Sequence, residues 1–127
     1  LTKLGRINRI NGNLDQAIDL LSHAIEIDMT NMDAYIELGK TYQNRRQHEK
    51  AIEIYNKAIS VVDNDYRLYF QAGIAYKECK DYRQAETMLR TAATLAPMET
   101  SIRRQLASVI TLNLVNTLQE APNRYEH

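Results

Sequence analysis

The sequence predicts an all-α fold, in which helix pairs stack one after another as a solenoid. The first observation is a period of 34 residues, a length typical of helical repeat proteins. The second is helical spacing of the apolar residues within each period. The third is a low content of four glycines and two prolines in 127 residues, as expected for helices joined by short turns. The small residues that repeat at this period are Gly5, Gly39 and Gly73; Ala17, Ala51 and Ala85; and Ala24, Ala58 and Ala92.

The apolar residues of the second period lie on two helical faces. One face is formed by Tyr35, Leu38, Gly39 and Tyr42, at positions i, i+3, i+4 and i+7. The other is formed by Ala51, Tyr55, Ala58 and Ile59, and the polar stretch 44–47 separates the two. The whole pattern predicts helices near 1–11, 14–28, 32–45, 48–62, 66–79, 82–95 and 100–119.

The small residues of the repeat predict close helix crossings. Gly39 and Ala51 are placed where two antiparallel helices cross, and a larger side chain there would hold the two backbones apart. Ala58 is placed against the next unit. We therefore expect Gly39 and Ala58 to be buried.

These residues resemble the tetratricopeptide repeat (TPR) family, whose pattern is an aromatic residue, Leu-Gly, Tyr, Ala, a bulky apolar residue, Ala and Pro. The resemblance covers roughly residues 1–99 and implies a right-handed α-solenoid of about three helix pairs. The first unit departs from the pattern at Asn8, where Tyr is expected, and at Met29, and the second has Asp63 in place of proline. The third unit matches as Tyr69, Ala72, Gly73, Tyr76, Ala85, Leu89, Ala92 and Pro97.

The register also predicts the domain limits. We expect one domain over residues 1–120, with repeats at about 1–31, 32–65 and 66–99, a capping helix at about 100–119, and a disordered tail at 121–127. Because the first unit should start before Leu1, the chain is interpreted as a piece of a longer protein. The capping helix covers the last core face of the solenoid. Its expected apolar stripe is Ile102, Leu106, Val109, Ile110 and Leu114.

Composition narrows the function classes. Sixteen basic residues balance sixteen acidic ones, so no global charge attracts nucleic acid or a membrane surface. No apolar run reaches the roughly 18 residues that span a bilayer. The single cysteine, Cys79, excludes an internal disulfide and a cysteine-rich metal site and suits a reducing, cytoplasmic location. We expect no cofactor, no metal, no nucleic acid and no membrane association.

The sequence shows no catalytic arrangement, because no set of reactive residues converges by spacing. His48 occupies the same position of the 34-residue repeat as Leu14 and Tyr82, so it is expected to pack at a helix start. His23 is expected to be solvated, and Cys79 to be a half-exposed thiol without a role. Most tyrosines occupy core columns, which leaves little for stacking nucleic-acid bases. The prediction is that the chain is not an enzyme.

The resemblance implies a concave groove, lined by the first helix of each pair, where a partner peptide or helix binds. The repeat positions that face away from the core, counted from the Leu-Gly pair, carry a net charge of about +4 in a neutral chain. They hold seven basic residues (Lys3, Arg6, Arg9, Lys40, Arg67, Lys77 and Arg104) and three acidic ones (Asp33, Glu37 and Glu78). Apolar residues at these positions indicate a partner site. The candidate groove residues are Arg6, Arg9, Ile36, Glu37, Lys40, Gln43, Arg67, Phe70, Gln71, Ile74 and Lys77. The expected partner is a protein or peptide that is acidic and partly apolar.

One TPR subtype clamps the C-terminal carboxylate of a chaperone tail with Lys, Asn and Arg. The matching positions here are Thr2, Arg6, Glu37, Arg67 and Gln71, of which only Arg67 fits. Because Glu37 would repel a carboxylate, the sequence argues against this partner.

Two alternatives to groove binding stay open. The first is self-association, as a homodimer formed through the truncated first repeat or the C-terminal helix, where Leu112, Val115 and Leu118 lie beside the main stripe. Ile36, Phe70 and Ile74 would also be explained without any partner if they lean into neighbouring helices or cover core left exposed at the ends. The second is RNA binding through the basic face, which the zero net charge disfavours.

Overall fold

The computed structural model describes residues 1–62 and 64–125, the last five by their backbone alone. Within these residues the chain forms seven α-helices and no strand, which confirms the all-α prediction. The helices are α1 (Thr2–Ile10), α2 (Leu14–Ile27), α3 (Met32–Asn44), α4 (His48–Val61), α5 (Tyr66–Glu78), α6 (Tyr82–Leu95) and α7 (Thr100–Tyr125). Each of the first six begins and ends within one residue of its predicted limits.

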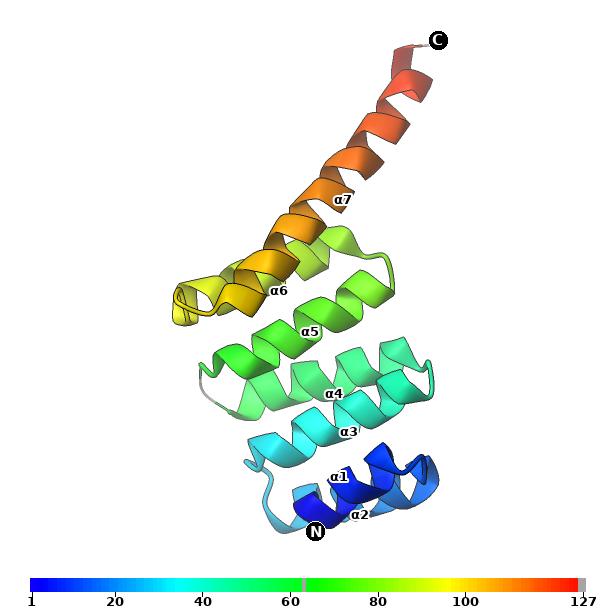
Figure 1. Cartoon of the computed structure of the whole chain (residues 1–127), viewed down its shortest axis with the longest axis vertical. Helices are drawn as coiled ribbons and strands as arrows, with labels where there is room; N and C mark the ends of the chain where they lie inside the picture. Colours follow the sequence, from blue (N-terminus) through cyan, green and yellow to red (C-terminus); the bar gives the residue numbers. More distant parts are fainter. Residues whose placement is uncertain (63, 126–127) are drawn as a thin grey trace.

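The helices stack in chain order from one end of the molecule to the other (Figure 1). Each helix packs against its neighbours in sequence, and α1, α3, α5 and α7 also contact one another in turn. The second helices α2, α4 and α6 therefore form one layer of the stack and the first helices form the other. This layering brings residues 34 positions apart onto one continuous face.

The repeated small residues lie at the helix crossings, as predicted. A Cβ atom at Gly39 would collide with the ring of Tyr55, and one at Gly73 would lie 2.7 Å from Leu89 Cγ. Ala58 has no exposed surface. Each pair therefore approaches closely because a large side chain of its second helix fills the space above a glycine of its first.

The turns inside the pairs share one backbone feature. Their middle residues, Gly12, Arg46 and Lys80, have φ angles of 83°, 61° and 64° and are spaced by 34 residues. A left-handed residue ends a helix because it cannot continue the right-handed backbone, and it costs least at glycine. The reversal of the chain in each pair is therefore local and recurs at the repeat period.

The end of the chain differs from the prediction. α7 continues to Tyr125 instead of ending near 119, so residues 121–125 are helical where a disordered tail was expected, and residues 126–127 lie outside the described part. Two stripe residues were also assigned wrongly, because Ile110 and Leu114 are 37% and 58% exposed. α7 packs against one side only, on α6 and the edge of α5. Its buried stripe is therefore narrow and comprises Ile102, Val109 and, in part, Leu106.

The first testable prediction concerns the crossing at Ala58. Ala58→Leu should destabilise the protein by roughly 1–3 kcal/mol, because the extra methylenes have no space between α4 and its neighbours. Lys57→Leu, at the adjacent exposed position, is the matched control and should change stability little. The measurement is urea unfolding followed by circular dichroism. Equal midpoints for the two variants would contradict the assigned packing.

The second prediction concerns the α7 stripe. Ile102→Ala should cost roughly 2–4 kcal/mol, because a buried side chain is lost and a cavity remains. Ile110→Ala, one face away on the same helix, should cost less than about 1 kcal/mol, since that side chain is partly solvated already. Thermal melting of both variants tests the pair, and a larger loss at Ile110 would show that α7 packs through the other stripe.

Candidate functional site

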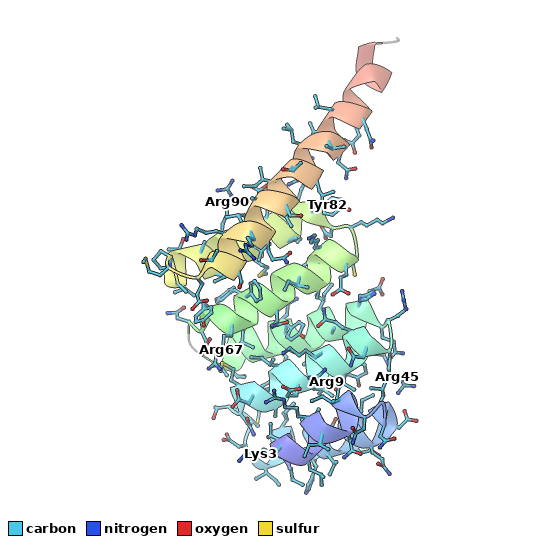
Figure 2. The ribbon with its side chains drawn as sticks, in the orientation of Figure 1. Lys3, Arg9, Arg45, Arg67, Tyr82 and Arg90 are labelled. Atoms are coloured by element: carbon cyan, nitrogen blue, oxygen red, sulfur yellow. The ribbon has the colours of Figure 1, made fainter. Side chains whose placement is uncertain are left out.

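The candidate site is the surface of α1, α3 and α5 on which the predicted groove residues lie, here called the first-helix face. These three helices lie side by side because each pair repeats the same crossing. In Figure 2, Arg9 lies where α1 meets α3, and Arg67 lies near the start of α5. The face is defined by Arg6, Arg9, Ile36, Glu37, Lys40, Gln43, Arg67, Phe70, Gln71, Ile74 and Lys77.

A buried ion pair joins the first two helices of the face. Arg9 Nε lies 2.9 Å from Glu37 Oε2, and Arg6 Nε lies 3.9 Å from Glu37 Oε1. Glu37 is only 8% exposed. Its carboxylate therefore offsets one of the three positive charges of α1 from within the protein. The sequence counted Glu37 as a solvated acid of the groove, because spacing alone does not show that two arginines from α1 cover it.

A hydrogen-bonded chain ties α3 to α4 and α5. The Tyr55 hydroxyl donates to Gln43 Oε1 at 2.7 Å, and Gln43 Nε2 donates to Glu78 Oε1 at 2.5 Å. Burial, followed by the nearby charge of Glu78, raises the pKa of Tyr55, so its hydroxyl remains a donor at neutral pH. The amide of Gln43 is thus held in one orientation, with its oxygen toward the core and its nitrogen toward α5.

The remaining basic residues of the face divide into paired and unpaired groups. Arg67 lies 3.3 Å from Asp65 and 3.8 Å from Asp33. Lys77 Nζ donates to Gln105 of α7 at 3.1 Å. Lys40 makes no ion pair with any described residue. It borders a depression of about 350 Å³ whose other lining residues are Arg9, Gln43, Asn44 and Glu78.

The apolar part of the face is smaller than predicted. Ile36 is 8% exposed and belongs to the core cluster of the first two pairs, so its expected exposure to solvent was wrong. It is buried because α1 and α5 flank α3 on both sides. Phe70, Ile74 and Gln71 are half-buried, and Phe70 also packs against the cluster formed by Ala85, Leu89 and Val109. Phe70 and Ile74 are therefore the apolar side chains that the face presents.

The other side chains with reactive groups lie apart from this face. His48 begins α4, as expected, and its Nδ1 lies 3.6 Å from Glu78. His23 is exposed, as predicted. Cys79 is exposed rather than half-exposed, and partial desolvation, followed by the charges of Glu49, Glu78 and Asp81, raises the pKa of its thiol. Cys79 is therefore protonated at neutral pH and a weak nucleophile.

Among the described residues, no group of three or more His, Cys, Asp or Glu side chains has a geometry that could hold a metal ion. None of the described helices is both long and apolar enough to cross a membrane.

Comparison with family models identifies the chain. Tetratricopeptide repeat models match residues 9–72 and 66–97. The chain therefore belongs to the tetratricopeptide repeat family, which its repeat residues resemble.

Individual relatives match the chain at low identity. BBSome complex member BBS4 from Xenopus tropicalis is 25% identical over 114 residues, which is 90% of this chain and 20% of that protein. The chain spans about a fifth or less of the length of the curated relatives it matches.

Solved structures share the fold. The first TPR of Spaghetti (RPAP3), bound to the HSP90 peptide SRMEEVD, superimposes with a TM-score of 0.80 at 17% identity, over 87% of each chain. PcrH, in complex with the chaperone binding region of PopD, gives a TM-score of 0.72 at 21% identity, over 92% of this chain and 89% of that one.

The third prediction concerns the ion pair beneath the first-helix face. Glu37→Ala should destabilise the protein by roughly 1–3 kcal/mol, because Arg9 loses its partner at a largely buried position. Glu53→Ala, on the exposed side of α4, should stay within about 0.5 kcal/mol of wild type. Urea unfolding at neutral pH measures both. Equal stability of the two variants would show that the Arg9–Glu37 contact is not formed in solution.

Proposed function

We propose that this chain is a protein-interaction scaffold, whose first-helix face is a groove that binds an acidic, partly apolar peptide or helix of another protein. The observation that carries the proposal is the position of Lys40. Its ammonium group has no ion-pair partner among the described residues, and it borders the depression between α1, α3 and α5. Half-buried Phe70 and Ile74 on α5 supply apolar contacts on the same face.

The charge of the face supports an acidic partner. The face carries five basic side chains and one acidic one, a net charge of +4, and the rest of the neutral chain is correspondingly acidic. Internal ion pairs satisfy Arg9 and Arg67 in part. Lys40 has no ion pair among the described residues, so its charge can meet a partner carboxylate, as can that of the exposed Arg6. Rim charges of this kind mainly raise the association rate, whereas apolar anchors set the lifetime of the complex.

The structural neighbours support peptide binding on this fold. Two of them are described as complexes, one with an HSP90 peptide and one with a region of PopD. At 17% and 21% identity these likenesses concern the fold, so the partner is inferred from the residues of this chain.

The residues disfavour a chaperone tail as that partner. At the five clamp positions only Arg67 matches, and its guanidinium already contacts Asp65 and Asp33. Glu37 occupies a position where the clamp needs asparagine. A tail carboxylate would therefore find no amide donor at this position, where a carboxylate paired with Arg9 stands instead.

We further propose that the chain acts without catalysis, cofactor or metal and within a larger protein. The protonated thiol of Cys79 and the scattered carboxylates support the first part, since no described set of groups is arranged for proton transfer or nucleophilic attack. The small fraction of its relatives' length that the chain spans supports the second.

The fourth prediction tests the groove with an array of twelve-residue peptides graded in acidic and apolar content. Binding should increase with both, to about micromolar strength, or roughly −8 kcal/mol. Lys40→Glu should slow association, and more strongly at low salt, because screening is weakest there. Ile74→Ala and Phe70→Ala should raise the dissociation rate and cost at least roughly 1–2 kcal/mol of binding.

The controls for this test separate binding from folding. Each variant is first melted, because Phe70 also contacts the core and its loss of binding counts only if the fold is retained. Glu53→Lys, on the opposite layer of helices, should bind like wild type. If the groove variants bind normally while Glu53→Lys abolishes binding, the site lies on the second helices instead.

A further inference from the structure

The last helix has a form that the repeat does not require. α3 and α5 each have 13 residues, whereas α7 has 26. The first half of α7 packs against α6 and the edge of α5. The second half extends beyond the stack (Figure 1).

α7 continues through the position where the earlier first helices end. The left-handed residues Gly12, Arg46 and Lys80 reverse the chain at steps of 34, and the next step falls on Leu114. Leu114 lies in the middle of α7. Residues 113–125 therefore extend α7 instead of folding back as the second helix of a fourth pair.

The face that such a second helix would cover is open. In the earlier pairs, Gly5, Gly39 and Gly73 receive the side chains of Leu21, Tyr55 and Leu89 from the second helix. The equivalent residue of α7 is Ala107, which is exposed. Next to it, and one and two turns further on, lie Ile110, Leu114 and Leu118, which are 37%, 58% and 60% exposed.

The charge of this segment indicates what can cover it. No residue from Gln105 to Gln119 is charged. A two-fold interface places one surface against a copy of itself, so any charge near its centre meets a like charge. A neutral stripe avoids that cost. A basic polar face, which would attract anionic lipid, is missing from this segment.

We propose that two copies of this chain associate through antiparallel pairing of their α7 helices, about a two-fold axis at Leu114. Because 110 and 118 lie equally far from 114, Ile110 of one copy then packs against Leu118 of the partner subunit, and the reverse contact forms as well. The partner's helix covers the exposed apolar stripe from Ile110 to Leu118. This proposal uses a different surface from the groove and is independent of it.

The fifth prediction is tested by sedimentation equilibrium of the 127-residue chain over a concentration series up to about 100 µM, the range expected for a small interface. Wild type should pass from monomer to dimer and no further. Leu114→Asp should weaken the dimer at least about 100-fold, because two leucine contacts are lost and two carboxylates meet at the axis. Met98→Asp, an exposed apolar position before α7, is the matched control and should dimerise like wild type.

A mixing experiment tests the symmetry. Leu114→Asp and Leu114→Lys should each be monomeric, and an equimolar mixture should form a heterodimer, because residue 114 faces residue 114 across the axis. Thermal melts should show that both variants remain folded, and Lys40→Glu should leave the mass unchanged.

Three outcomes would overturn the proposal. They are a wild-type monomer at every concentration, a dimer that Leu114→Asp leaves intact, and a mass that rises beyond the dimer and is abolished by Leu4→Asp. The last result would indicate head-to-tail stacking through α1.

Discussion

The close approach of two helices at a glycine is the constraint on which the rest of this structure depends. Gly5, Gly39 and Gly73 each lie under a large side chain of the following helix, Leu21, Tyr55 or Leu89. A Cβ atom would separate the helices of the pair. The crossing recurs at one period, so every pair has the same shape and successive first helices lie side by side. The first-helix face exists because of this repetition, although none of its own side chains makes the crossing.

That arrangement also decides the electrostatics of the face. Because α1 and α3 lie side by side, Arg6 and Arg9 reach Glu37, and the Arg9–Glu37 pair is largely withdrawn from solvent while Arg6 stays exposed. The net charge of about +4 already counts Glu37, so this ion pair leaves the total unchanged and determines where on the face the positive charge lies. Part of the positive charge is paired inside the stack, as at Arg9, and the rest, which includes Lys40 and the exposed Arg6, remains at the surface. Specificity on such a face depends on which charges the neighbouring repeat has already neutralised.

The difference between contacts within one repeat and contacts between repeats explains how much of the structure the sequence could predict. Helix limits and crossings follow from local spacing and from small residues, so six helices were predicted within one residue. The burial of Ile36 and Glu37 depends on side chains from α1 and α5, which no single repeat contains. The stripe of α7 was misassigned at Ile110 because an end helix is covered on one side only. The length of α7 could have been predicted, because Leu114 stands at the repeat position where the earlier pairs have a left-handed turn residue. A missing turn residue is, however, a weaker signal than a turn residue that is present.

At each end of the stack, a helix lacks one of the neighbouring helices that cover α3 and α5 in the inner repeats. In the inner repeats, Leu38 and Thr41 of α3 and Ala72 and Ala75 of α5 are at most 3% exposed, because the preceding second helix covers them. The equivalent residues of α1, Leu4 and Ile7, are 49% and 53% exposed. Stability in a solenoid is roughly a sum of repeat and neighbour terms, so α1 lacks one neighbour term that α3 and α5 have.

We infer that α1 opens at a lower free energy than α3. Amide exchange should therefore be faster in α1 than in α3, and also in the second half of α7 whenever it is unpaired. Equal protection of α1 and α3 would show that repeat coupling, rather than local burial, sets the stability of the ends.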